Sequence, residues 1–371
     1  MPAAGSRQLV SLAMPPGEDF LAAFDEAWDA DHAVLPLDPA APRAAQERLL
    51  AAMRPDEPVD DDVALVIATS GSTGEPKGAQ LSHVAIEASS RATHDRIGRE
   101  PDDVWLACLP WHHVGGLQVM LRSRLLDIPL IVHERFDVER FRYAEATLTS
   151  LVPTQLVSLL DAGVDLGRFR AILLGGAAAP ADLLERARSA GARVVTTYGM
   201  SETSGGCVYD GRPLDGVEIR SLDDGRLAIR GPMLMSGYRL RPDLTAEALV
   251  DGWLVTNDLG QVGAGGRVVV SGRADDVIIT GGENVVADDV AAVVARHPAV
   301  SEAAVVGVPD DRWGQRVVAV VVGEVTLEDL RDWCSMSLPR AALPRAVVAV
   351  AALPRLSTGK LDRLAVRGLA G

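Results

Sequence analysis

The stretch "DVALVIATSGSTGEPKG" (62–78) joins an apolar run to a loop rich in glycine and hydroxyl side chains. The apolar part, 62–69, has the short run of Val, Leu and Ile that is typical of a buried strand. A helical pattern follows the loop from Leu81, with Ser82 as its expected N-cap. Backbone N–H groups in a loop between a strand and a helix are free to bind phosphate. The stretch therefore predicts an anion-binding loop.

Two familiar phosphate-binding motifs are excluded by the spacing within this loop. A Walker P-loop requires G-x-x-x-x-G-K-[ST], but Pro76 precedes Lys77, and Gly78 stands where the hydroxyl residue should be. The G-x-G-x-x-G pattern of a Rossmann fold is absent from the loop as well. On local sequence alone, an ordinary solvated turn remains the alternative.

Composition limits the class of protein. The chain has 371 residues, enough for two or three domains, and its net charge of −15 argues against unassisted binding of nucleic acid. We expect no membrane insertion and no signal peptide, because no apolar run approaches the roughly 20 residues of a membrane span and the start is not basic. Three widely spaced cysteines argue against a disulfide framework, and the histidine spacing fits no zinc site. We therefore expect a cytoplasmic protein.

Between residue 62 and about residue 200, strand-like runs alternate with helical stretches. Expected strands are 103–110, 128–133, 169–176 and 192–199, and expected helices are 140–148 and 179–191. This alternation predicts an α/β fold in which helices cover both faces of a sheet.

The pattern changes after about residue 210. Short strands at 217–222, 226–231 and 267–272, separated by turns such as "DDG", "GY" and "AGG", predict a small antiparallel sheet or barrel. Further on, helical patterns at 287–300 and 326–336 accompany strand patterns at 302–309 and 315–323. We therefore expect a large N-terminal domain over 1–274 and a small α+β C-terminal domain over 275–371.

Five motifs occur in a fixed order along most of the chain. They are "TSGSTGEPKG" (69–78), "TTYGMSET" (196–203), "GWLVTNDLG" (252–260), "GRADDVIITGGENV" (272–285) and "STGKLDR" (357–363). In these motifs the chain resembles the AMP-forming acyl-CoA synthetases of the adenylate-forming superfamily. Two further segments, 109–122 and 150–160, resemble the o-succinylbenzoate–CoA ligases of menaquinone biosynthesis. Many relatives have more sequence ahead of the phosphate loop, so we expect a shortened N-terminal region.

The resemblance implies both a fold and a reaction. The fold is α/β: αβ layers with a small β-sheet or barrel subdomain, then a mobile α+β C-terminal domain that carries the catalytic lysine. In the reaction, a carboxylate attacks the α-phosphate of ATP and releases pyrophosphate, and the thiol of CoA then displaces AMP. The implied cofactors are ATP and Mg²⁺, with CoA as a substrate and o-succinylbenzoate as the acid. A homodimer is compatible with the resemblance.

Roles for individual residues follow from the same motifs. The nucleotide is expected to contact Thr69, Ser70, Gly71, Ser72, Thr73, Gly74, Lys77, Gly175, Gly176, Ala177, Tyr198, Gly199, Thr203, Asp258 and Arg273. The expected catalytic residues are Lys360 and His113, and the expected ligand of Mg²⁺ is Glu202. The substrate is expected to contact Arg122, Met200 and Ser201, the hinge to lie at Asp275, and CoA to pass Gly281 and Gly282.

These residue types suit the chemistry that the resemblance implies. A carboxylate such as Glu202 suits a hard cation, and Asp258 can accept hydrogen bonds from both ribose hydroxyls. An ammonium at Lys360 stabilises the negative charge that develops at the α-phosphate more strongly in the transition state than in the ground state. The guanidinium of Arg122 suits the second carboxylate of o-succinylbenzoate.

Simpler interpretations remain open for several of these residues. Lys360 is also explained as a solvated charge, and Arg122 as a surface arginine on a helix. His112 and His113 fit ordinary loop residues, and Glu202 fits a capping or surface acid. Three alternatives to the main function remain: a ligase for another aryl or fatty acid, a free-standing enzyme that loads a carrier protein, and a non-catalytic nucleotide-binding relative.

Overall fold

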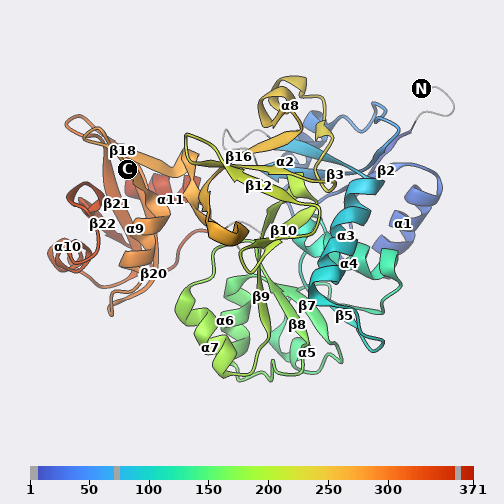
Figure 1. Cartoon of the computed structure of the whole chain (residues 1–371), viewed down its shortest axis with the longest axis horizontal. Helices are drawn as coiled ribbons and strands as arrows, with labels where there is room; N and C mark the ends of the chain where they lie inside the picture. The colour runs from blue at the N-terminus through green and yellow to red at the C-terminus, as the bar shows by residue number, and fades with distance from the viewer. Residues whose placement is uncertain (1–6, 71–75, 356–360) are drawn as a thin grey trace. The chain divides into compact units, whose positions relative to one another are not determined.

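The computed structural model describes residues 7–70, 76–355 and 361–371 (Figure 1). The fold separates into two compact units. The first unit comprises Met1–Ile219, Ala228–Val255 and Ala264–Val268, and the second comprises Arg220–Leu227, Thr256–Gly263 and Val269–Gly371. The second unit thus includes two short segments from earlier in the chain, and the domain boundary near Asp275 remains a prediction.

The first sheet of the first unit contains the strand that precedes the phosphate loop. Its strand order is β1-β2-β3-β4-β14, in which β3 pairs antiparallel with β4. The strands are β1 (Leu9–Leu12), β2 (Ala33–Pro36), β3 (Val63–Ser70), β4 (Pro76–Ser82) and β14 (Gly237–Tyr238). Helix α2 (Arg43–Met53) packs on this sheet through Met53, which lies in an apolar cluster with Leu35 and Val66. Helix α1 (Glu18–Asp29) reaches α3 (His83–Ile97), where the rings of Trp28 and His83 are 4.7 Å apart.

The second sheet has seven strands in the order β11-β10-β9-β8-β7-β5-β6, and the run from β6 to β9 is parallel. The strands are β5 (Trp105–Ala107), β6 (Leu130–Val132), β7 (Leu148–Leu151), β8 (Ala171–Leu174), β9 (Val194–Met200), β10 (Gly205–Tyr209) and β11 (Arg212–Pro213). Helix α3 contacts β4 and β10, and α4 (Val114–Leu126) contacts β5, β7 and β10, so this helix pair lies between the two sheets. The other helices beside this sheet are α5 (Val138–Arg142), α6 (Pro153–Asp161) and α7 (Ala181–Ser189). Parallel strands covered by helices confirm the α/β class.

Two further sheets follow after residue 210. The third has the order β12-β13-β16-β15, and β17 pairs with β16. Its strands are β12 (Glu218–Ser221), β13 (Arg226–Arg230), β15 (Leu249–Val250), β16 (Trp253–Val262) and β17 (Val268–Arg273), and α8 (Pro242–Ala248) precedes β15. This confirms the short-stranded sheet expected from the sequence.

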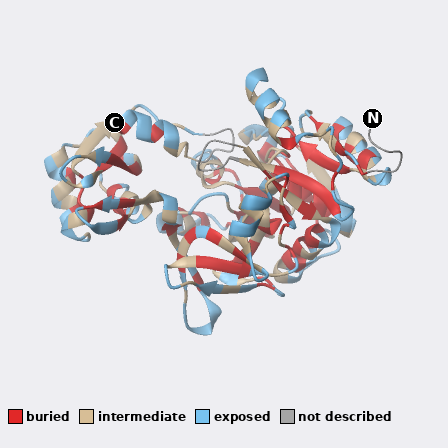
Figure 2. Ribbon diagram, turned by 90° about the horizontal axis from the view of Figure 1, so that it is seen from above, coloured by how far each residue is buried: buried red, intermediate tan, exposed pale blue. Residues whose placement is uncertain are grey.

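The fourth sheet lies in the second unit and has the order β19-β18-β21-β20, with β22 on β21. Its strands are β18 (Val277–Thr280), β19 (Glu283–Val286), β20 (Val300–Asp310), β21 (Gly314–Gly323) and β22 (Ala346–Ala349), with helices α9 (Ala287–Val294), α10 (Leu327–Ser335) and α11 (Arg363–Ala370). Helices α9 and α10 share one apolar cluster with the sheet, and α11 shares a second one through Val366 and Ala370. Figure 2 shows buried residues concentrated in the strands of the sheets. The α+β character expected here is confirmed.

Three local predictions differ from the structure. Residues 140–148 are helical only as far as Arg142, because Leu148 pairs with β5 and β8 as the start of β7. Residues 76–82, expected as the end of a loop and the start of a helix, form β4, and "GY" (237–238), expected as a turn, forms β14. In each case hydrogen bonding to a neighbouring strand outweighs the local pattern. None of the helices in the described part of the chain has the length and apolar character needed to cross a bilayer.

Candidate active site

The described ends of the phosphate-loop motif lie on paired strands. Thr69 on β3 pairs with Lys77 on β4 in the β3–β4 hairpin. The predicted residues Gly71, Ser72, Thr73 and Gly74 lie outside the described residues, and Ser70 is the last residue of β3. Helix α3 begins directly after β4, and the Oγ of Ser82 accepts a hydrogen bond from the N–H of Ala85 at 3.1 Å. The predicted N-cap at Ser82 is therefore confirmed.

Lys77 and Glu202 both contact the side chain of Tyr238. Glu202 belongs to the short 3₁₀ helix η1 (Ser201–Thr203) that follows β9, and its Oε1 accepts a hydrogen bond from the hydroxyl of Tyr238 at 2.7 Å. The Nζ of Lys77 lies 5.3 Å from the centroid of the same tyrosine ring. Lys77, predicted to bind phosphate, and Glu202, predicted to bind the metal, therefore contact the same aromatic side chain. Tyr238 was not among the predicted site residues, because its sequence pattern is that of a turn.

The hydroxyl of Thr203 is engaged by the backbone around it. Thr203 is fully buried; its Oγ1 accepts from the N–H of Met200 at 2.9 Å and lies 2.7 Å from the carbonyl of Gly205, to which it can donate. Binding the α-phosphate would require this hydroxyl to give up the Gly205 contact. Met200 ends β9 and Ser201 opens η1, so both predicted substrate residues adjoin Glu202.

The two segments expected to contact adenine are neighbours. Gly175, Gly176 and Ala177 follow directly after β8, which pairs with β9 in parallel. A Cβ on Gly175 would lie 2.3 Å from the Oγ1 of Thr197, so this position requires glycine. Tyr198 and Gly199 directly follow Thr197 on strand β9. The geometry is therefore compatible with a shared adenine site at the ends of β8 and β9.

Arg273 links the predicted ribose carboxylate to the predicted hinge. Its Nη1 donates to the Oδ1 of Asp258 at 3.1 Å, and its Nε and Nη2 donate to the two carboxylate oxygens of Asp275 at 3.1 and 3.0 Å. Burial lowers the pKa of Arg273, but the hydrogen bonds and charge of Asp275, together with the charges of Asp258 and Asp276, raise the pKa overall. Three residues predicted separately from two motifs therefore form one ion-pair network within the second unit.

Two histidines precede α4. The ring centroids of His112 and His113 are 4.2 Å apart, and the Nε2 of His112 lies 3.8 Å from the Oδ2 of Asp38, too far for a hydrogen bond. Burial lowers the pKa of His112, more strongly than the charge of Asp38 raises it. Trp111 packs against Phe20 in the core, with the rings 5.1 Å apart, so it belongs to the hydrophobic core.

Arg122 is not a surface arginine. It lies on α4 and is 3% exposed, and its guanidinium makes no hydrogen bond or ion pair with any described residue. Its Cζ lies 5.7 Å from the centroid of the Trp105 ring. Burial lowers the pKa of Arg122. An unpaired buried cation is energetically costly, so the guanidinium of Arg122 is suited to bind an anion.

The pKa of His94, whose side chain is affected by the charge of Arg122, predicts how the stability of the fold depends on pH. Burial, reinforced by the charge of Arg122 and by Arg170 but opposed by Asp103, lowers the pKa of His94 to about 4, and the imidazole Nε2 accepts a hydrogen bond from Trp105. Since the unfolded chain binds this proton at higher pH, the contribution of His94 is fully present above about pH 6.5. It is lost as the pH falls toward 4.

We expect the free energy of unfolding to fall between pH 6.5 and 4.5, with His94 contributing at most about 1.4 kcal/mol per pH unit. Urea unfolding of the wild type and of His94→Gln at pH 7.5, 5.5 and 4.5 measures this. The variant should have a shallower slope. Equal slopes would contradict the assignment.

The second unit holds the remaining predicted residues. Gly281 and Gly282 form the turn between β18 and β19, where their φ values of 61° and 84° favour glycine. Lys360 lies outside the described residues, and the flanking residues Arg355 and Leu361 form an antiparallel bridge.

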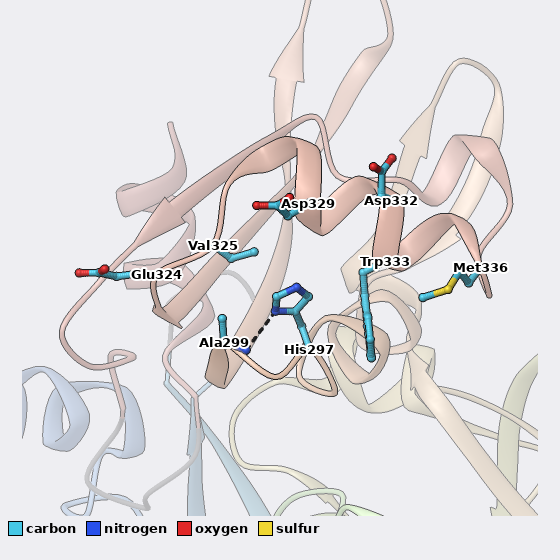
Figure 3. A pocket seen from close by; sticks show the side chains of 8 residues that line it. All are labelled: His297, Ala299, Glu324, Val325, Asp329, Asp332, Trp333 and Met336. Atoms are coloured by element: carbon cyan, nitrogen blue, oxygen red, sulfur yellow. Dashed lines mark hydrogen bonds between the residues drawn. The ribbon is translucent and has the colours of Figure 1, made fainter.

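Two cavities are lined by residues other than the predicted site residues. One of about 410 Å³ is lined by His297, Trp333 and acidic residues of α10 (Figure 3), and one of about 450 Å³ lies beside α7 and β9. Neither is lined by a residue of the five motifs except Thr196, which bonds to Asp210 at 3.0 Å. The three cysteines are buried thiols, and the described residues contain no cluster of three or more His, Cys, Asp or Glu side chains able to hold a metal.

Two family models match this chain. The model "AMP-binding enzyme" covers residues 43–239, and "AMP-binding enzyme C-terminal domain" covers residues 289–360. The chain belongs to the AMP-binding enzyme family. The first match includes the motifs that contain Lys77 and Glu202, and the second match ends at Lys360.

Named relatives within the AMP-binding enzyme family are similar over most of the chain. A probable 2-succinylbenzoate–CoA ligase of Mycobacterium tuberculosis (strain CDC 1551 / Oshkosh) is 47% identical over 347 residues, 88% of this chain and 89% of the relative. The o-succinylbenzoate CoA synthetase (MenE) of Bacillus subtilis, solved with the acyl-adenylate intermediate OSB-AMP, superposes with a TM-score of 0.89 at 27% identity, over 98% of this chain and 89% of that one. The same enzyme with ATP and magnesium ion superposes with a TM-score of 0.87 at 27% identity, over 97% of this chain and 89% of that one.

The carboxylate of Glu202 is of a kind that suits a magnesium ion such as the one bound with ATP in the B. subtilis enzyme. Mg²⁺ is usually held by one or two carboxylates together with substrate phosphates and water, so a cluster of protein ligands is not required. Glu202 is half-buried and fixed by Tyr238, and it follows the strand expected to contact adenine. The residues present therefore fit a magnesium ion shared with ATP.

Proposed function

We propose that this AMP-binding enzyme is an acid–thiol ligase that joins o-succinylbenzoate to CoA through an acyl-adenylate, releasing pyrophosphate and AMP. The observation that supports this most is the 47% identity, over 88% of the chain, to a probable 2-succinylbenzoate–CoA ligase. The superposition with the B. subtilis enzyme bound to OSB-AMP supports the same reaction. We place the reaction in the cytoplasm, where ATP and CoA are available, and a homodimer is to be checked by light scattering on the purified protein.

In the first half-reaction, ATP and the acid are held so that the acid carboxylate meets the α-phosphate. Lys77, Thr69 and the loop between them bind the β- and γ-phosphates, while Asp258 and Arg273 bind the ribose. A magnesium ion on Glu202 would neutralise phosphate charge and help pyrophosphate to leave. Lys360 stabilises the charge that develops as the acid oxygen bonds to phosphorus and the bond to pyrophosphate breaks.

In the second half-reaction, the thiol of CoA attacks the acyl carbon and AMP leaves. One face of the acyl-adenylate cannot accept the thiol while Lys360 occupies it. We therefore propose that the C-terminal domain rotates about Asp275, removing Lys360 and bringing Gly281 and Gly282 toward the pantetheine chain. His113 lines the passage between the acyl group and the thiol.

The direct test is an incubation with ATP, Mg²⁺ and o-succinylbenzoate in which pyrophosphate is measured, followed by CoA and detection of the thioester. Pyrophosphate followed by o-succinylbenzoyl-CoA is the expected result. Pyrophosphate without a CoA product would indicate a carrier-protein acceptor. If only another aryl or fatty acid gave both products, the reaction class would stand and the acid would be wrong.

Arg122 is expected to bind the second carboxylate of the acid. Replacing it with methionine removes the guanidinium but keeps an apolar side chain of similar length in a buried position. Because a hydrogen bond to a charged group contributes about 1.5–3 kcal/mol, we expect the KM for o-succinylbenzoate to rise about tenfold or more, with the KM for ATP unchanged. Thermal stability should not fall, since the wild-type cation is unpaired among the described residues.

Arg124→Met is the matched control for this variant. Arg124 lies on the same helix but is partly exposed and pairs with Asp25 at 2.5 Å. Its replacement should leave the KM for o-succinylbenzoate unchanged. A wild-type KM in Arg122→Met would remove Arg122 from the substrate site.

A further inference from the structure

Tyr238 occupies a position between two segments that the proposed function assigns to the nucleotide. Its hydroxyl donates to the Oε1 of Glu202 at 2.7 Å, and its ring centroid lies 5.3 Å from the Nζ of Lys77. A hydrogen bond to a carboxylate fixes which way its oxygens point, and an ammonium near an aromatic ring is attracted by the ring's negative face. One side chain thus orients both an anionic and a cationic group.

The backbone around Tyr238 is bonded to the same two segments. On one side, the N–H of Met235 donates to the carbonyl of Glu202 at 2.9 Å. On the other side, Gly237 and Tyr238 pair with Gln80 and Ala79 on β4, and the N–H of Arg239 donates to the carbonyl of Gly78 at 2.8 Å. The segment 235–239 therefore connects η1 directly to the hairpin that carries Lys77.

Arg239 anchors this connecting segment to the body of the unit. It is 2% exposed, and its guanidinium donates to four backbone carbonyls at the end of α2 and in the turn that follows. These acceptors are the carbonyls of Met53, Arg54, Glu57 and Pro58, at 2.6, 2.9, 2.6 and 3.1 Å. Because every acceptor is a main-chain oxygen, the anchor depends on the fold and not on a neighbouring charge. Arg239 thus fixes the backbone next to Tyr238, whose hydroxyl and ring contact Glu202 and Lys77.

We propose that Tyr238 is a positioning residue for the magnesium–nucleotide complex, acting by fixing Glu202 and Lys77 relative to each other. Among the described residues, no other hydrogen bond or ion pair holds either side chain. Both are only half-buried, and Lys77 has several rotatable bonds, whose freedom is costly to lose on binding. By restricting them before ATP arrives, Tyr238 reduces the entropy lost when phosphates and metal bind. This inference rests on the proposed function, because it presumes that the phosphates bind between these residues.

The variant Tyr238→Phe tests the proposal because it deletes the hydroxyl and keeps the ring. ATP affinity is measured by calorimetry without acid or CoA, with and without Mg²⁺, so that binding is separated from turnover. We expect the variant to lose about 3- to 10-fold in ATP affinity in the presence of Mg²⁺, the range expected for one hydrogen bond. In the absence of Mg²⁺ its affinity should equal that of the wild type. The side chain of Tyr143 is exposed, so the variant Tyr143→Phe is the matched control and should bind ATP as the wild type does.

A double-mutant cycle separates a positioning role from a general structural one. If Tyr238 acts through Glu202, then Tyr238→Phe should have little further effect on Mg²⁺-dependent ATP affinity in the Glu202→Gln background. Additive losses, or an equal loss with and without Mg²⁺, would overturn the proposal. Failure of the wild type to bind ATP with Mg²⁺ would instead overturn the proposed function, so the two failures are distinguishable.

Discussion

Replacing Lys360 with alanine is expected to lower the rate of acyl-adenylate formation by about 10²-fold or more, the scale of losing one preorganised electrostatic contact. The reason is that negative charge develops at the α-phosphate in the transition state, where an ammonium stabilises it more than in the ground state. The measurement is pyrophosphate release with ATP, Mg²⁺ and o-succinylbenzoate. Conversion of chemically prepared o-succinylbenzoyl-adenylate to the CoA thioester should keep its wild-type rate. That reaction is the control for folding, and near-normal pyrophosphate release by the variant would contradict the role.

The small number of lysines in the chain suggests a second variant for this experiment. Of its 36 basic residues only two are lysines, Lys77 and Lys360, and both lie in motifs assigned to phosphate chemistry. All other basic positions use arginine, so a lysine at these two positions indicates a need for a compact ammonium. A guanidinium is planar and larger, and it distributes its charge over five N–H donors. We therefore expect Lys360→Arg to restore only a small part of the lost rate although the charge is kept.

Strand and helix periodicity gave most of the fold correctly where a run was long and bounded by turns. Strands β8, β9, β20 and β21 and helices α7 and α10 all lie where the alternation of apolar residues placed them. Two of the three misplaced segments, 76–82 and 237–238, are paired with each other in the structure although they are distant in the sequence. A two-residue strand has no periodicity of its own, so no local pattern could have identified β14.

The site shows the same division between local and long-range information. Glu202, Asp258 and Arg273 were predicted as site residues from the resemblance of their motifs to the acyl-CoA synthetases, because each motif is a contiguous stretch of sequence. Tyr238 was missed because its proposed positioning role depends on contacts with Lys77 and Glu202, far from it along the chain. The burial of Arg122 was likewise undecided, since the charge of an arginine on a helix favours exposure. Only tertiary packing reveals that this guanidinium lies in the core without a described partner.

Replacing Asp275 with proline is expected to leave pyrophosphate release largely intact while slowing thioester formation by about 10²-fold. Asp275 lies in the short 3₁₀ helix η3 (Ala274–Asp276), between β17 and β18. Proline fixes φ near −65° and restricts the preceding residue, so a change of backbone conformation here becomes costly. A cost of about 3 kcal/mol for reaching the second conformation corresponds to roughly 10²-fold in rate. The two half-reactions are measured separately, as pyrophosphate release and as CoA thioester formed from preformed adenylate.

The ion pairs of Asp275 require a second variant as a control. Its carboxylate accepts two hydrogen bonds from Arg273, which also bonds to Asp258, so any replacement alters the predicted ribose site. Asp275→Ala removes these bonds but leaves the backbone free to rotate. If the hinge proposal is right, the alanine variant retains thioester formation and has at most a raised KM for ATP, while the proline variant loses thioester formation. Equal loss of thioester formation in both variants would assign the effect to the Arg273 network, and equal loss of both half-reactions in the proline variant would reject the hinge. The pair of variants thus separates backbone freedom from charge at a residue where the structure combines them.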